Sequence, residues 1–296
     1  MEIDAKKRKM LYVVVIIICI ASIIIGIVTE IATTNPATKK GEEKKPVSSG
    51  NGGSNIPSTE TIEGLQKEFE YMFKNNVDIS GIDDSGVAKL YPDEEIVFTA
   101  YKNNKIEKDK YNIDINIPMI NIGSGVAGEF NGITQKYFAD KTQEVIENSR
   151  EFTIYNVYYT GYVNDNILSL VIKSTLKVGN SPQKTFITAY NYNLETGLKY
   201  DINEAVKSRG IKMEEAQEKI NLMMKGVERD TNSLKEALKD NESQSKTIYE
   251  RKFDDKMYKI ENTETYFLGP KGFLYIIYSY GNKDGENTSA VDIVKI

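Results

Sequence analysis

The chain has 296 residues, 40% of them hydrophobic and 27% charged, which is enough for one packed domain or two small ones. It contains no histidine and no tryptophan, and Cys19 is its one cysteine. This composition excludes a histidine general base, a zinc site of the usual His/Cys kind and an intramolecular disulfide.

An uncharged apolar run, Met10–Val28, follows four basic residues at positions 6–9. As a helix the run measures about 28 Å, which matches the roughly 30 Å hydrocarbon core of a bilayer. Because the basic residues precede it, we expect the N-terminus in the cytoplasm and the rest of the chain outside. A core helix would show a polar face, and a cleavable signal peptide would have a shorter apolar region ending in small residues. The favoured interpretation is an uncleaved anchor in the cell membrane, with Cys19 as an apolar membrane residue.

Residues 30–60 are rich in Ser, Gly, Pro, Thr and paired charges, which is typical of a flexible stalk. The sequence therefore predicts a single-pass protein with an extracytoplasmic domain. The expected parts are a cytoplasmic tail (1–9), a transmembrane helix (10–29), the stalk (30–60), an N-terminal helix with a connecting region (61–110) and two α+β subdomains (111–202 and 203–296).

The first elements after the stalk are a helix and a strand. Over Thr61–Asn75, apolar residues recur at steps of three and four, which predicts an amphipathic helix docked on a core. Over Tyr111–Ile117, apolar and polar residues alternate, which is typical of a strand with one solvent-facing side. Pro118 and the shift of apolar phase after it predict a bulge or an edge position.

Gly123, Gly125 and Gly128 follow this strand with the G-x-G-x-x-G spacing of a dinucleotide-binding loop. In that fold the preceding strand is apolar almost throughout, whereas here every second residue is polar. Glu144 and Glu147 lie where a ribose-binding acid would be sought, but both fall in a charged helical stretch. We interpret the glycines as a strand-to-helix turn that uses positive φ angles, without a bound nucleotide.

The clearest strand pattern comes next. Strands are predicted over Phe152–Val163 and Ile167–Lys177, with Asn164–Asn166 as the turn between them, followed by a third strand that ends at Leu194. Leu198–Ile202 is expected to extend this antiparallel meander.

The last third begins with helical spacing over Met213–Val227 and ends with apolar runs that predict strands at 266–268, 273–280 and 291–296. Antiparallel sheets and helices in separate blocks indicate an α+β fold and argue against a βαβ array.

Five segments in this order resemble a known family: Tyr111–Pro118, Phe130-Asn131, Ile167–Leu170, Tyr190–Gly197 and Tyr266–Gly272. The chain from Tyr111 to Ile296 is similar to a pair of extracytoplasmic domains of unknown function, DUF3298 with DUF4163. The pair occurs in the anti-sigma factor RsiV, a lysozyme receptor, and in the N-terminal part of the deacetylase PdaC. The resemblance implies an envelope domain that binds a ligand. Anti-sigma and deacetylase activities do not transfer, because nine residues before the anchor are too few to fold around a sigma factor and no deacetylase domain is found.

Patterns that could carry chemistry are few. Ser181 and Lys184 form Ser-x-x-Lys, but in a proline-containing turn and not at a helix start. Three acid clusters are interpreted as solvated surface: Asp83-Asp84, Asp93-Glu94-Glu95 and Asp254-Asp255. Four residues near the C-terminus resemble a calcium loop with its glycine misplaced, and predict a β-turn: Asn282, Asp284, Glu286 and Asn287. We assign no catalytic, cofactor-binding or metal-binding residue.

From Thr61 onward the net charge is −7, which disfavours nucleic acid and favours basic protein partners. Tyr155, Tyr158, Tyr159 and Tyr162 are expected to alternate between the sheet interior and a surface suited to binding. The leading hypothesis is a non-catalytic, membrane-anchored cell-envelope domain with a sensor or receptor role. Its ligand would be an envelope protein, a lysozyme-like basic protein or peptidoglycan. The alternatives are a peptidoglycan-acting enzyme that uses carboxylates and a structural accessory subunit of a membrane complex.

Overall fold

The computed structural model describes residues 62–79, 86–240, 248–281 and 288–296. Within these ranges no helix is both long enough and apolar enough to cross a bilayer. The predicted tail, anchor and stalk lie outside the described residues, and the anchor therefore stays a prediction.

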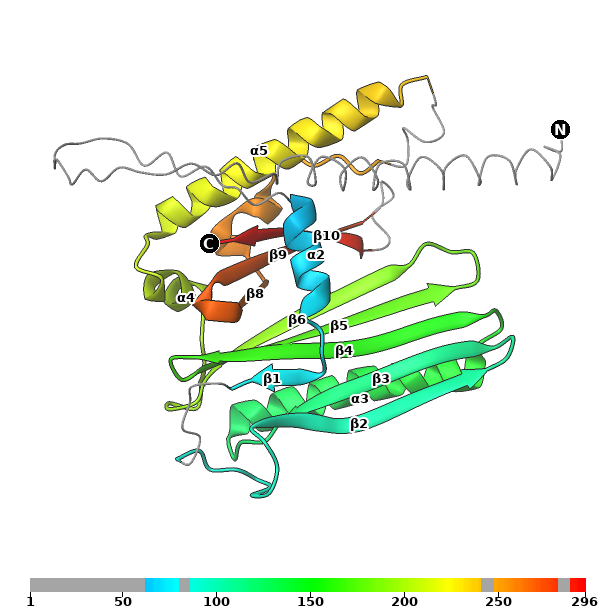
Figure 1. Cartoon of the computed structure of the whole chain (residues 1–296), viewed down its shortest axis with the longest axis vertical. Coiled ribbons are helices and arrows are strands. Elements are labelled where there is room, and N and C mark those ends of the chain that lie inside the picture. Colours follow the sequence, from blue (N-terminus) through cyan, green and yellow to red (C-terminus); the bar gives the residue numbers. More distant parts are fainter. Residues whose placement is uncertain (1–61, 80–85, 241–247, 282–287) are drawn as a thin grey trace, which may run out of the picture. The chain divides into compact units, whose positions relative to one another are not determined.

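Two β-sheets and several helices make up the described chain (Figure 1). The larger, seven-stranded sheet has the order β2 (Val97–Glu107), β3 (Tyr111–Ile120), β4 (Thr153–Asn164), β5 (Ile167–Val178), β6 (Lys184–Asn193) and β7 (Leu198–Lys199), with β1 (Asn76–Asp78) beside β4. The smaller sheet has the order β10 (Thr288–Lys295), β9 (Leu274–Gly281) and β8 (Thr265–Leu268). The expected α+β fold with largely antiparallel sheets is confirmed.

The β4–β5 hairpin follows the sequence closely. All twelve residues of β4 pair with β5, from Thr153 opposite Val178 to Asn164 opposite Ile167. Asp165 and Asn166 form the connection with φ angles of 47° and 64°, a left-handed conformation that these residue types tolerate. The predicted turn is confirmed.

The irregularity predicted at Pro118 is present, with its extra residue on the neighbouring strand. Pro118 lies opposite Thr99 and Ile117 lies opposite Tyr101, so Ala100 of β2 bulges out. The predicted solvent-facing side of β3 is only partly right, because Asn116 is 5% exposed. Its amide donates to Asp114, which also accepts a hydrogen bond of 2.8 Å from Tyr158 on β4.

The sequence did not predict one connection within the larger sheet. β3 and β4 are parallel and are joined by the helix α3 (Gly125–Asn148), so the fold contains a βαβ crossover. β1 also pairs with β4 in parallel. The alternation of apolar residues predicts which face of a strand is buried but not which strand lies beside it, and a long helix between two strands permits parallel pairing.

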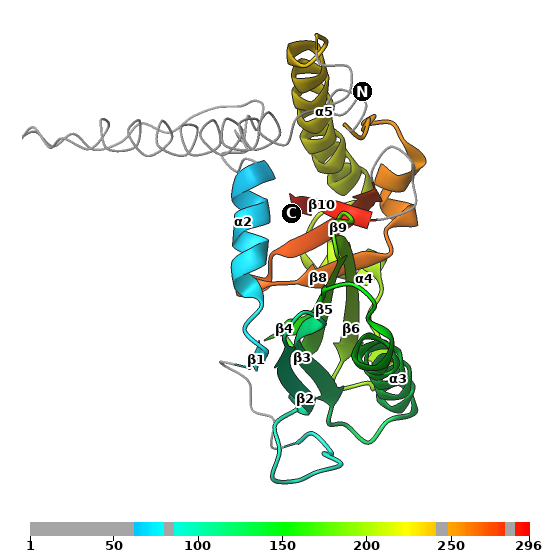
Figure 2. The ribbon, with the colours of Figure 1, turned by 90° about the vertical axis from the view of Figure 1, so that its right-hand side faces the viewer.

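Helices cover the larger sheet on both faces (Figure 2). On one face α3 buries Ala127, Phe138 and Val145 against the strands. On the other face the smaller sheet and the helix α2 (Ile62–Met72) pack together against Val171 and Ile187. Three of the apolar residues predicted for the docked helix, Leu65, Phe69 and Met72, are buried, which confirms that helix.

The remaining helices are α4 (Ile202–Ser208) and α5 (Met213–Ala237), with short 3-10 helices at Lys256–Tyr258, Ile260–Asn262 and Pro270–Gly272. Ile202 was expected to end a strand, but it begins α4. Asp201 caps that helix reciprocally with Glu204, with both hydrogen bonds at 2.9 Å. An Asp-x-x-Glu spacing at 201–204 was the available signal. Helix α5, predicted correctly, buries Ala216, Ile220 and Val227.

Candidate functional site

A cleft of about 590 Å³ opens where α2, β1, β4 and the 3-10 helix at Pro270 meet. Its volume falls in the range of small-ligand sites in proteins. Its walls carry two tyrosines, three charged side chains and several apolar ones: Glu68, Tyr71, Met72, Lys74, Asn76, Val77, Asp78, Ile79, Thr160, Gly161, Tyr162 and Pro270.

The short strand β1 forms one wall because the larger sheet splits beside it. β3 pairs with β4 only as far as Ile115 opposite Val157, and β1 pairs with β4 from Asn76 opposite Thr160 onward. Asn75 makes the turn into β1 with a φ of 55°. Its backbone N–H donates to the Tyr159 carbonyl at 2.9 Å, and its side-chain oxygen accepts from the Tyr159 N–H at 3.1 Å. The hydrogen bonds of Asn75 therefore hold the start of β1, and the pairing with β4 holds the rest of the strand.

Gly161 on β4 allows β1 to approach this closely. A Cβ atom at this position would lie 2.8 Å from the Ser169 carbonyl oxygen and 2.8 Å from a methyl group of Val77. Such contacts are too short for any side chain, so the floor of the cleft requires glycine.

The helix α2 supplies the opposite wall and is held by polar contacts as well as apolar ones. Glu68 accepts a hydrogen bond of 2.6 Å from the Tyr275 hydroxyl, and Lys295 lies 3.4 Å from the same carboxylate oxygen. Glu70 pairs with Lys173, whose side chain is 8% exposed and lies over the Phe73 ring. These contacts fix the helix against both sheets.

The electrostatics of the cleft favour a cationic group. Glu68 and Asp78 place two carboxylates in the lining of the cleft and Lys74 places one ammonium there, while Lys295 pairs with Glu68 from behind the helix wall. Burial raises the pKa of Tyr162, the Thr160 hydroxyl lowers it, and the charges of Asp78 and Glu68 raise it further. Tyr71 is 80% exposed at the rim. Carboxylates beside aromatic rings are a setting in which ammonium and guanidinium groups bind.

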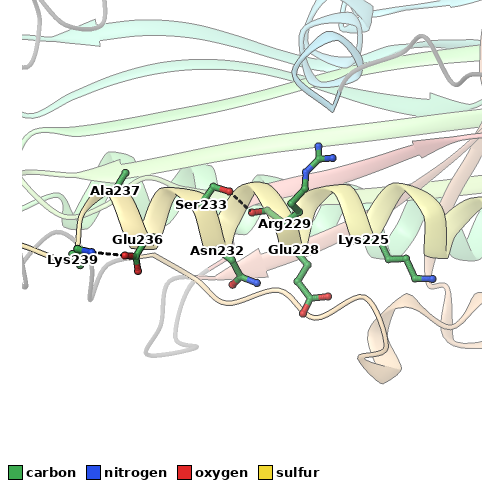
Figure 3. Close-up of a pocket in the computed structure, with 8 residues that line it drawn as sticks. All are labelled: Lys225, Glu228, Arg229, Asn232, Ser233, Glu236, Ala237 and Lys239. Atoms are coloured by element: carbon green, nitrogen blue, oxygen red, sulfur yellow. Dashed lines mark hydrogen bonds and ion pairs between the residues drawn. The ribbon is translucent and has the colours of Figure 1, made fainter.

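A larger depression of about 870 Å³ runs along α5 (Figure 3). Every residue that lines it belongs to α5 or to the two residues after it, so no second element of the described chain faces it. Four of its five charged groups are exposed, and Lys239 pairs with Glu236 within the same wall. The fifth, Glu228, is half-buried and accepts from the Phe253 N–H at 3.3 Å. We interpret it as the solvated face of one helix.

The glycine-rich turn has a different role from a nucleotide loop. Ser124 caps α3 by accepting from the Ala127 N–H at 3.1 Å, and Tyr192 donates to the Ser124 hydroxyl at 2.7 Å. None of the three glycines has a positive φ, so the expectation that they provide left-handed turn geometry was wrong. Gly125 and Gly128 lie in the first turns of α3, with open space around them.

The other candidate residues do not come together. Ser181 and Lys184 lie in and after the turn between β5 and β6, as expected. The clusters at Asp93 and Asp254 are exposed, while Asp83-Asp84 and the residues from Asn282 to Asn287 lie outside the described residues. Among the described residues, no three acidic side chains or other metal-ligand groups gather closely enough to hold a metal ion. Glu144 and Glu147 are exposed on α3.

Of the four clustered tyrosines, Tyr155 and Tyr159 are each 2% exposed, and Tyr158 and Tyr162 are partly exposed on the other face. The predicted alternation is therefore confirmed, and Tyr162 lines the cleft. The other cleft residues come from positions 68 to 270, and no local sequence pattern joins them. The glycine inside an otherwise apolar and aromatic strand at 161 was the one signal of a close backbone approach.

No protein-family model matches the chain, and no curated protein matches it. Among solved structures, the chain is similar to a DUF3298 family protein from Pseudomonas aeruginosa. The identity is 12% and the TM-score 0.36, over 69% of this chain and 88% of that one. It is also similar to a member of the DUF3298 family from Bacteroides fragilis. There the identity is 13% and the TM-score 0.31, over 62% of this chain and 81% of that one.

Proposed function

We propose that the chain is a single-pass, membrane-anchored envelope protein whose extracytoplasmic domain binds a protein or cell-wall ligand without catalysis. The observation that carries the proposal is the cleft between α2 and β4, where Glu68 and Asp78 lie near Tyr71 and Tyr162. The ligand presents a cationic group there. The order of sequence segments supports kinship with the domain pair of RsiV and PdaC, and the apolar run Met10–Val28 supports the anchor.

The ligand-binding part predicts that Tyr71→Ala weakens binding at least about tenfold, which is the loss expected when an aromatic anchor is removed. Tyr71 is 80% exposed, so the variant should fold normally. The full chain in detergent micelles is immobilised and tested for retention of egg-white lysozyme, as a basic probe protein, and of isolated peptidoglycan.

Tyr101→Ala is the matched control, because Tyr101 is a partly exposed tyrosine on β2 that does not line the cleft. It should bind as the unmodified chain does. Retention of neither probe, or equal retention by both variants, would contradict the proposed role of the cleft.

The anchoring part predicts the side of the membrane on which each segment lies. In a Cys19→Ser background, Ser49→Cys should react with a membrane-impermeant maleimide on intact cells. Ala5→Cys should react only after the cells are opened, because the basic residues before the apolar run keep the N-terminus inside. Labelling in the reverse order, or recovery of the chain in the soluble fraction, would refute the proposed topology.

A further inference from the structure

The outer edge of the larger sheet at β6 is open over most of its length. β6 pairs with β5 along its ten residues, but β7 covers it only at Tyr192 and Asn193. The Asn191 carbonyl accepts from the Tyr200 N–H, which shows that the backbone N–H and C=O of Asn191 point away from β5. In an antiparallel ladder the backbone groups of every second residue point to the same side. The backbone N–H and C=O groups of Thr185, Ile187 and Ala189 therefore also point away from β5. Their outward backbone groups have no hydrogen-bond partner among the described residues.

The strand at the opposite edge of the sheet, β2, is protected against pairing with another strand. It carries the bulge at Ala100 and the lysines Lys102 and Lys105, features that prevent one edge strand from pairing with another. β6 has no proline and no bulge, and its one charge is Lys184 at its start. An edge of this kind is suited to accept another strand.

An apolar surface lies beside the open edge. Ile133 and Tyr137 on α3 are 64% and 52% exposed, and Phe186 on β6 is 45% exposed. The Tyr137 and Phe186 rings are 5.4 Å apart. The backbone of α3 packs mainly against β3, and its Phe130 and Tyr137 rings reach Tyr190 and Phe186 of β6. The strands β8 and β10 approach β6 from the opposite face of the sheet. The open edge of β6 and the apolar side chains of Ile133, Tyr137 and Phe186 form one surface, which we call the β6 surface.

We propose that the β6 surface pairs with the same surface of a second copy of this chain. The two β6 strands run antiparallel and are centred on Ile187, so that Thr185 lies opposite Ala189 of the second copy. The outward N–H and C=O groups then satisfy each other across a two-fold axis. The larger sheet becomes continuous through both copies.

The charges of the strand favour this occupant. With Ile187 at the centre, Lys184 lies opposite Tyr190 of the second copy, and no two like charges of the strands face each other. A lysine beside an aromatic ring is attractive, and the arrangement occurs twice by symmetry. Phe186 lies opposite Thr188 of the second copy, and this register brings the exposed apolar side chains of the two copies together.

The test uses the full chain with Cys19→Ser in detergent micelles, studied by sedimentation equilibrium. The unmodified β6 should give a concentration-dependent dimer. Thr185→Pro removes an outward N–H from each copy without touching the β5 ladder, and should weaken dimerisation about tenfold or more. Lys184→Glu, at an exposed position, should weaken it about fivefold or more.

Ala100→Pro at the bulge of β2 is the matched control and should leave the dimer intact. Melting curves should show that the variants remain folded, and Lys184→Glu keeps the test decisive if Thr185→Pro does not fold. A monomer at all concentrations would overturn the proposal, as would a dimer that withstands both β6 variants. Binding of another protein's strand by a monomeric chain would overturn it as well.

Discussion

Arg251→Ala is expected to lower the free energy of unfolding by about 3–5 kcal/mol at pH 7.5, because it leaves a buried carboxylate without its partner. Arg251 donates to Asp292 at 2.6 Å and to the Thr231 hydroxyl at 3.0 Å, with its guanidinium 4.5 Å from the Tyr280 ring. Asp292 is 1% exposed on β10 and accepts a further hydrogen bond of 3.3 Å from Tyr258. The pair ties the segment after α5 to the smaller sheet.

The size of the effect should depend on pH. Burial raises the pKa of Asp292 from 3.8 to about 6, against the opposing charge of Arg251. The folded state therefore holds this proton more tightly than the unfolded chain does. The resulting stabilisation is fully present below pH 3.8 and is lost as the pH rises through 6. A difference of about 2 in pKa between the folded and unfolded states corresponds to a change of about 3 kcal/mol in the free energy of unfolding. Without Arg251 the carboxylate is still harder to ionise, so the loss should be larger at pH 7.5 than at pH 5.

Urea unfolding of the full chain in micelles at both pH values measures this effect. The control is the double variant Arg251→Ala with Asp292→Asn, which removes both charges. It should be more stable than Arg251→Ala alone at pH 7.5 and should not share that variant's dependence on pH. If Arg251→Ala lost the same stability at both pH values, Asp292 would not be the group responsible.

The parts of the fold that could be predicted are those in which one face of an element is buried. β4 and β5 alternate between two environments, and the Asp165-Asn166 turn sets their register. β2 falls in the predicted connecting region, because most of its residues are exposed and its sequence VFTAYKNNKIE therefore has no apolar periodicity to detect. Among the described strands it pairs only with β3, and that pairing holds it in the sheet.

Partner choice and the cleft could not be predicted for a different reason. The parallel pairing of β3 with β4 depends on how α3 crosses the sheet, which no local pattern encodes. The cleft depends on β1 entering beside β4, and only Val77 of that three-residue strand is buried. A strand with one buried side chain gives too weak a signal, although Gly161 is the residue that makes room for it.

The docking of α2 connects the fold with the proposed site, and Phe69→Ala tests it. Phe69 is fully buried, with its ring centroid 4.9 Å from that of Phe73 and 6.1 Å from that of Phe267 on β8. Removing an aromatic side chain from such a core costs about 3–5 kcal/mol. Because α2 forms one wall of the cleft, Phe69→Ala should also weaken ligand retention.

The free energy of unfolding is measured in urea. The exposure of α2 is measured by limited trypsin digestion at Lys67, which is exposed on the helix, and at Lys74, which is exposed two residues after the helix ends. Phe69→Ala should be cut faster at both sites before global unfolding begins, since the helix loses the contact that joins it to the smaller sheet. Tyr71→Ala lies two residues away but faces solvent, so it should leave both the unfolding energy and the cleavage rate unchanged while still impairing binding. If the two variants had equal effects on stability, the amphipathic docking of α2 would be wrong. If Phe69→Ala weakened stability but left ligand retention intact, α2 would be a structural helix and the binding surface would have to lie elsewhere.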